Sequence, residues 1–257
     1  MPLEFTSASL AMTTSGMNAA AEQLGVSPIE IWTVFDVETK GCGFLPDRRP
    51  PILYERHIFH RLTAGQFDDG DISDKAPGGY GPDGAHQYDR LDRAIALNRE
   101  AALKSCSWGL GQIMGENFAA GGFPNVEGMV TAMCTGEDAQ LLAVAGFIVA
   151  NRLVDALKNH RWAAFASVYN GPSYIENRYD TKLAGAFAKF SAGALPDLNL
   201  RSAQLYLTYR GFNTGGVDGL MGPRTRSAIT QFQQMSHLPV TGVIDSATLT
   251  ALQPNAT

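Results

Sequence analysis

The sequence has few cysteines and no long hydrophobic run. Cys42, Cys106 and Cys134 form an odd set without metal-binding spacing. They are expected to be unpaired small core residues, typical of a protein made in a reducing compartment, with a Cys42–Cys106 disulfide as the alternative. The longest apolar run, residues 141–150, is too short to span a bilayer. We therefore expect a buried helix there and no membrane insertion.

Blocks of basic residues are also missing, and the formal net charge is -5. Both observations argue against a nucleic-acid-binding protein. The first five residues, Met-Pro-Leu-Glu-Phe, lack the basic region of a secretory signal, so we expect synthesis in the cytoplasm without a signal peptide. A length of 257 residues allows one large domain, or a medium domain with a small one.

The clearest local pattern is a helix beginning after Ser27. Ser27 and Glu30 form a capping box, and Pro28 occupies the first helical position. Gly41 is the expected end of the helix, because glycine readily adopts the left-handed conformation.

This helix carries a carboxylate on its apolar face. Ile31, Val34, Phe35 and Glu38 follow the i, i+3, i+4, i+7 spacing of one helix face. Burial and the negative end of the helix dipole should both favour protonated Glu38, as a general acid near neutral pH requires. The alternative is that Glu38 bends outward and is simply solvated.

The remaining elements of the first 190 residues are mostly helices. A helix predicted over 89–103 has Leu91, Ile95 and Ala102 facing inward and Arg90, Arg93 and Arg99 facing outward. A short strand is predicted within 50–54 and a long surface loop over 65–84. The other predicted helices cover residues 13–24, 55–62, 126–133, 137–157, 162–169 and 179–190.

The C-terminal part differs in pattern. Residues 191–197 are typical of a linker, which divides the chain into a domain at 1–190 and a small domain at 198–257. A weak repeat pairs the turn at 216–219 and Thr225 with the turn at 242–245 and Thr248. Helices are predicted after these turns, over 225–235 and 246–252. We expect a small three-helix module.

Residues 107–115, Ser-Trp-Gly-Leu-Gly-Gln-Ile-Met-Gly, form a glycine-rich motif. The spacing of the glycines does not fit a dinucleotide-binding site, and no strand is predicted before them. Closely spaced glycines allow a ligand to approach the backbone, and Gln112 offers an amide suited to sugar hydroxyl or acetamido groups.

The helix-ending Glu38, the motif at 107–114 and residues 169–172 (Tyr-Asn-Gly-Pro) occur in the order found in the lysozyme superfamily. They resemble goose-type lysozymes and soluble lytic transglycosylases. With residues 43–46 and 51–57 included, residues 10–190 are most similar to the N-acetylmuramidase family of phage endolysins. Gly111 departs from this pattern, because related sequences more often carry a bulky residue there.

The C-terminal domain resembles the peptidoglycan-binding domain 1 family. The matching segments are residues 217–219, 222–225, 232–233 and 238–242. The two resemblances are independent and imply the same polymer, bacterial peptidoglycan. We expect the module to raise the local enzyme concentration at the wall without altering the chemistry.

Together the resemblances imply a mainly α protein, with a lysozyme-like α+β catalytic domain and a peptidoglycan-binding domain. Glu38 would protonate the bond between N-acetylmuramic acid and N-acetylglucosamine. Gln112, Tyr169 and Asn170 would line the saccharide subsites, with Ser107 near the acid. Such an endolysin would act as a monomer and reach peptidoglycan with the help of a holin. The alternatives are a lytic transglycosylase using the same Glu38, or a non-catalytic wall-binding protein.

A second carboxylate has no clear signature. Asp36 should point away from Glu38, and Asp47, Glu55 and Asp89 are candidates, with Glu55 more typical of a structural residue paired with Arg56 or Arg152. We therefore favour one acid and a positioned water.

No cofactor or metal is expected. His57 and His60 lack the spacing of a helical zinc site. Trp32, Trp108 and Trp162 are expected in the core, with Trp108 the best candidate for a sugar platform.

Overall fold

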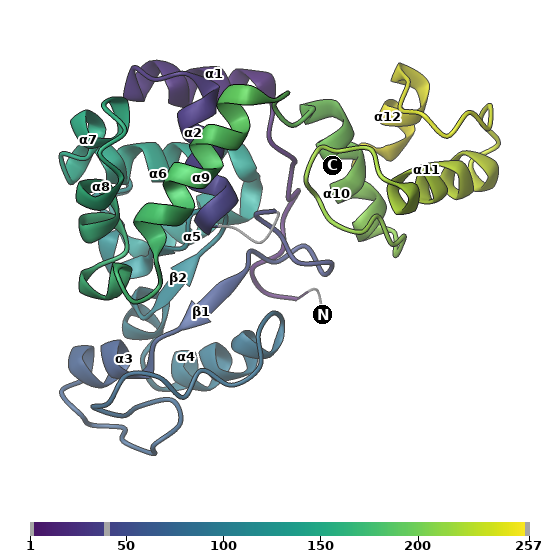
Figure 1. The fold of residues 1–257 in the computed structure, drawn as a ribbon. Helices are drawn as coiled ribbons and strands as arrows, with labels where there is room; N and C mark the ends of the chain where they lie inside the picture. Colours follow the sequence, from purple (N-terminus) through teal and green to yellow (C-terminus); the bar gives the residue numbers. More distant parts are fainter. Residues whose placement is uncertain (1–2, 39–41, 255–257) are drawn as a thin grey trace.

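The computed structural model describes residues 3–38 and 42–254, and most of them are helical (Figure 1). The helices of the first part are α1 (Thr14–Leu24), α2 (Pro28–Glu38), α3 (Arg56–Leu62), α4 (His86–Lys104), α5 (Val126–Thr135), α6 (Glu137–Ala150), α7 (Val154–Lys158), α8 (Trp162–Tyr169) and α9 (Tyr179–Ala192). Those of the C-terminal part are α10 (Leu198–Tyr209), α11 (Pro223–Met235) and α12 (Ser246–Leu252). Short 3-10 turns lie at Gly115–Asn117 and Pro172–Tyr174. The mainly α prediction is confirmed. Within the described residues no helix is long and apolar enough to cross a membrane.

One small antiparallel sheet consists of β1 (Ile52–Tyr54), β2 (Cys106–Trp108) and β3 (Ile113–Met114), in that order. Ile52 pairs with Trp108 and Ser107 with Met114. The β1 prediction is confirmed, whereas the β2–β3 hairpin was not predicted. Its strands are too short for a period-2 pattern, and the glycines between them obscure it.

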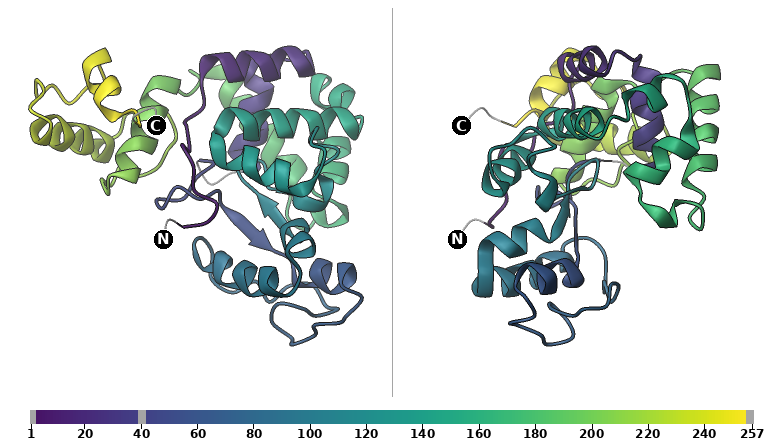
Figure 2. Two further views of the ribbon diagram at one scale, coloured as in Figure 1. Left: turned by 180° about the vertical axis from the view of Figure 1, so that it is seen from behind. Right: turned by 90° about the vertical axis from the view of Figure 1, so that its left-hand side faces the viewer.

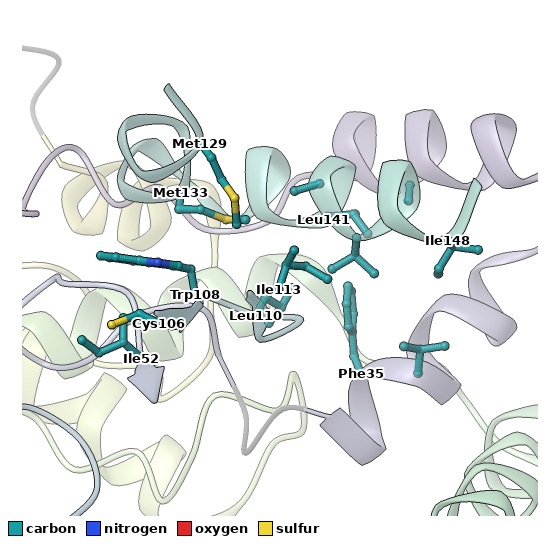
Figure 3. Close-up of a cluster of buried hydrophobic side chains, with 14 of the residues drawn as sticks. Phe35, Ile52, Cys106, Trp108, Leu110, Ile113, Met129, Met133, Leu141 and Ile148 are labelled. Atoms are coloured by element: carbon teal, nitrogen blue, oxygen red, sulfur yellow. The ribbon is translucent and has the colours of Figure 1, made fainter. Parts of the chain in front are cut away.

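The core of the first part lies between the sheet and the helices. Helix α6 supplies Leu141 and Ile148, which face Phe35 of α2, and Trp108 lies at the sheet side (Figure 3). The apolar run at 141–150 thus belongs to a core helix, as predicted. All three cysteines are free thiols, and Cys106 and Cys134 are buried, as the unpaired interpretation predicted.

The predicted helix over 137–157 is wrong as one element, because the chain breaks between α6 and α7. Asn151 ends α6 and its side-chain amide donates to Phe147 O at 2.9 Å. Arg152 then adopts a left-handed φ of 57°. A non-glycine residue in that conformation cannot continue a right-handed helix. Neither residue is a strong helix breaker, so the break could not be predicted from the residue types.

The prediction for α4 was right about its inner face and wrong about Arg90. Leu91 and Ala102 are buried, but Arg90 is only 8% exposed. Its guanidinium lies over the Tyr54 ring at 5.3 Å and pairs with Asp71 of the 65–84 loop at 3.2 Å. The long loop folds back over the helix and covers a side chain that helix periodicity alone places in solvent.

The C-terminal module repeats one local arrangement, as the sequence predicted, but the predicted register is wrong, because Gly242 corresponds to Gly219 and not to Gly216. Gln204 Oε1 accepts from the N–H groups of Asp218 and Gly219, and its amide donates to Thr225 at 3.2 Å. In the second copy, Gln233 Oε1 accepts from Thr241 and Gly242, and its amide donates to Thr248 at 3.0 Å. Each buried glutamine therefore ties a turn to the start of the following helix, which satisfies backbone groups in a small core.

Candidate functional site

Glu38 is the last residue of α2 within the described part of the chain. The predicted capping box is confirmed at the other end, where Ser27 N–H donates to Glu30 at 3.0 Å and Ser27 Oγ accepts from Ile29 N–H at 3.2 Å. Ile31, Val34 and Phe35 are buried. Glu38 continues this face and is half-buried, so it does not bend fully outward. Gly41, the predicted helix end, lies outside the described residues.

Asn170 holds the Glu38 carboxylate. Its Nδ2 donates to Glu38 Oε1 at 2.7 Å. Asn170 is at the C-cap of α8, where its N–H donates to Ala166 O at 2.9 Å, and Gly171 turns the chain with a left-handed φ of 77°. The helix end thus fixes the backbone of Asn170 while leaving its side chain directed at the acid.

The surroundings raise the pKa of Glu38. Burial is the main cause, because it disfavours the charged carboxylate. The Asn170 hydrogen bond and the positive charge of Lys182 act in the opposite direction and offset part of the effect. Glu38 therefore keeps its proton to higher pH than an exposed glutamate, as a general acid must.

Tyr169 connects α8 to the glycine-rich motif. Its hydroxyl donates to Gly111 O at 3.1 Å, and its ring stacks on Phe165 with centroids 5.2 Å apart. Burial, and secondly the nearby Glu38 charge, raise the pKa of Tyr169, so the phenol stays protonated. The structure therefore brings Tyr169, Asn170 and Glu38 together, with Gly111 as a neighbour.

Gly111 allows this close approach. A Cβ on Gly111 would lie 2.1 Å from Val144 Cγ2 and 3.1 Å from the Tyr169 hydroxyl. A larger residue at position 111 would therefore collide with the branched side chain of Val144 on α6.

Replacing Gly111 with alanine is expected to lower the free energy of unfolding by about 1–3 kcal/mol, because overpacking forces neighbours to shift. Urea denaturation measures this change. Adding Val144→Ala should recover part of the loss, since it removes the clashing methyl group. No difference between Gly111→Ala and the parent would show that the site is not tightly packed.

Ser107 and Gln112 lie together in the β2–β3 hairpin. Ser107 Oγ donates to Gln112 Oε1 at 2.8 Å, and the Gln112 amide donates to Gly109 O at 2.9 Å and Pro51 O at 3.2 Å. Gln112 has a left-handed φ of 48°, so these hydrogen bonds stabilise an uncommon backbone conformation. Both side chains therefore make hydrogen bonds within the protein. Ser107 donates to Gln112 and not to Glu38.

Sequence reasoning missed two neighbours of Glu38 on α9. Lys182 lowers the pKa of Glu38, and the Glu38 charge is one cause of the raised pKa of Tyr179, after burial. Helix α9 packs along α2 (Figure 1). The helix itself was predicted, and its i, i+3 pair of Tyr179 and Lys182 is visible in the sequence. Only the packing of α9 against α2 reveals that this pair faces the acid.

The other candidate carboxylates have partners of their own. Asp36 pairs with Lys189 at 2.6 Å and so points elsewhere, as predicted. Asp47 pairs with Arg49 at 2.7 Å, and Asp89 is exposed. Glu55 lies 3.1 Å from His57, so its partner is neither Arg56 nor Arg152. Burial is the main cause that raises the pKa of Glu55.

Among residues 3–38 and 42–254, no three or more metal-ligating side chains come together. His60 instead pairs with Asp68 at 2.6 Å. Trp108 is 0% exposed and donates from Nε1 to Leu103 O at 3.0 Å, so its candidacy as a sugar platform is wrong.

Comparisons with known proteins give a family for each part of the chain. The N-acetylmuramidase family matches residues 27–191, and a family described as a putative peptidoglycan-binding domain matches residues 197–252. The crystal structure of the Burkholderia AP3 phage endolysin is 41% identical in sequence, with a TM-score of 0.65, over 71% of this chain and 71% of that one. The comparison with curated proteins gave no match. The chain is a peptidoglycan N-acetylmuramidase with a peptidoglycan-binding domain, and it belongs to the N-acetylmuramidase family.

Proposed function

We propose that Glu38 is the general acid that protonates the glycosidic oxygen between N-acetylmuramic acid and N-acetylglucosamine. The observation that carries this proposal is the half-buried carboxyl group at a helix end, whose pKa burial raises while Asn170 fixes its orientation. Protonation of the leaving oxygen compensates the negative charge that develops as the bond breaks.

The second reactant in this proposal is a water molecule. A glycosidase that hydrolyses in one step needs room for water between the acid and the group that activates it. Asp47 pairs with Arg49 and Glu55 with His57, and none of their described contacts is with Glu38. These contacts support a single-acid mechanism with a water positioned by the site.

The proposed saccharide subsites include Ser107, Gln112, Tyr169 and Asn170. Asn170 offers the best support, because its Oδ1 is buried and has no hydrogen-bond partner among the described residues. A buried acceptor without a partner costs free energy, which an N–H or hydroxyl donor of the sugar would recover. Ser107 and Gln112 would contribute by shaping the hairpin.

Asn170→Ala tests the electrostatic part of the proposal. The Asn170 amide lowers the pKa of Glu38 by stabilising its charged form, so its removal should raise that pKa further. Activity that requires protonated Glu38 falls as pH rises through its pKa. The alkaline limb of kcat/KM for soluble glycan oligomers should therefore move to higher pH.

Ser167→Ala is the matched control, because Ser167 is an exposed hydroxyl on the same helix. It should leave the alkaline limb in place. An unchanged or acid-shifted limb in Asn170→Ala would contradict the assignment of Glu38 as the titrating acid.

The likeness to a phage endolysin supports a biological setting for this chemistry. In the proposed setting the enzyme is made in the host cytoplasm, is released with the help of a holin, and degrades the peptidoglycan. Glu38, Tyr169 and Asn170 all come from one chain, so the proposed site needs no second copy, and in this setting the enzyme would act as a monomer.

A further inference from the structure

An ion pair buried between the two parts of the chain connects the C-terminal module to the catalytic domain. Glu137 at the start of α6 is 0% exposed, and Arg201 of α10 is 1% exposed. Arg201 donates to both carboxylate oxygens, at 2.7 Å to Oε1, and its other nitrogen contacts Oε2. Burial opposes ionisation of Glu137, but the Arg201 charge and the hydrogen bonds outweigh it and lower the pKa of Glu137.

The charged Glu137 in turn holds two backbone segments of the catalytic domain. Its Oε1 accepts from Gly43 N–H at 2.7 Å and its Oε2 from Met12 N–H at 2.8 Å. One turn later, Gln140 donates to Gly43 O at 2.9 Å and accepts from Leu110 N–H at 2.7 Å. Glu137 and Gln140 of α6 thus hold the backbone N–H and C=O of Gly43, and Gln140 also holds the β2–β3 turn.

The segment that begins at Cys42 also packs into the C-terminal module. Phe44 is 3% exposed and belongs to the hydrophobic core that α10 and α11 form, together with Ala11 from the N-terminal segment. Tyr206 accepts from Ala11 N–H at 3.1 Å, and Tyr209 donates to Ser9 O at 2.8 Å. Figure 2 shows the N-terminal segment running between the module and the rest of the chain. These contacts are those of a shared core and not of a flexible tether.

We propose that Arg201 of the wall-binding module is a positioning residue for the active site. It keeps Glu137 ionised, so that Glu137 holds Gly43, which follows Glu38 by five positions. Without Arg201, a buried carboxylate would take up a proton or admit water, and its hydrogen bonds to Gly43 and Met12 would weaken. The module thereby stabilises the backbone at Gly43, in addition to binding the wall.

Arg201→Met in the full-length chain tests this inference, which rests on Glu38 as the acid. Methionine keeps the volume and removes the charge. We expect kcat for soluble glycan oligomers to fall about 10-fold, because small displacements of catalytic groups are costly. Amide exchange of a peptide covering residues 42–45 should become faster, and binding to purified sacculi should persist. Arg201→Lys keeps the positive charge but cannot form the bidentate contact with Glu137, so it should recover part of kcat.

Ile229→Ala is the matched control, because Ile229 is fully buried in the module core. This substitution should lower the melting temperature of the protein. When the variant is assayed below its melting temperature, kcat and the amide exchange at residues 42–45 should be unchanged. Equal losses of kcat in Arg201→Met and Ile229→Ala would overturn the inference, as would unchanged kcat and exchange in Arg201→Met. If Glu38→Gln were active, only the assignment of Glu38 as the acid would be wrong. Amide exchange at residues 42–45 tests the contact between Glu137 and Gly43 independently of that assignment.

Discussion

Glu38→Gln is expected to lower kcat on peptidoglycan about 1,000-fold, within the range that general acid catalysis contributes. Glutamine keeps the size of the side chain and can still pair with Asn170, but it has no proton of suitable acidity to give. Because the substitution is nearly isosteric, KM and the melting temperature should change little. Release of reducing sugar ends from purified sacculi measures the loss.

Asp36→Asn is the control for this variant. Asp36 lies on the same helix, is exposed and pairs with Lys189 at the surface. An exposed ion pair contributes little to stability, so Asp36→Asn should retain nearly full activity. Comparable activity of Glu38→Gln and the parent would show that another group supplies the proton.

Truncation after residue 196 is the second large effect we expect. It removes Arg201 and leaves the buried Glu137 charge unpaired, and it also exposes Phe44 and Ala11. Loss of one partner of a buried ion pair costs about 3–5 kcal/mol, a large share of the stability of an ordinary domain. Cleavage of soluble oligomers should therefore fall together with lysis of sacculi. The sequence alone predicted a module that only concentrates the enzyme, and the shared core argues against that expectation.

Chemical denaturation of the truncated chain measures the stability loss. Adding Glu137→Gln to the truncated chain should recover part of it, because the orphan charge is removed. A truncated domain with the stability of the corresponding full-length domain and full activity on soluble oligomers would show that the module is detachable.

The sequence predicted those features that depend on local patterns. The capping box of Ser27 and Glu30 and the apolar face ending at Glu38 both follow from spacing along one helix. The repeat of the C-terminal module was visible because each copy has a glycine turn before a threonine at the start of a helix, although the matching glycines are Gly219 and Gly242 and the predicted register was wrong.

Features that depend on packing between distant segments were not predictable. Lys182 faces Glu38 because α9 packs along α2, and Arg90 is buried because the 65–84 loop covers it. Glu137 lies in the first turn of a helix, a position where glutamate is common, so its pairing with Arg201 carries no local signal. Its partner lies in a module that begins 61 positions later, at Leu198.

Mass spectrometry of peptidoglycan digested by the parent enzyme and by Glu38→Gln tests the central claim most directly. Hydrolysis with Glu38 as the acid predicts products that end in reducing N-acetylmuramic acid, one water heavier than the anhydro form, from the parent and almost none from Glu38→Gln. Products ending in 1,6-anhydro-N-acetylmuramic acid, or the same reducing ends from both proteins, would contradict it.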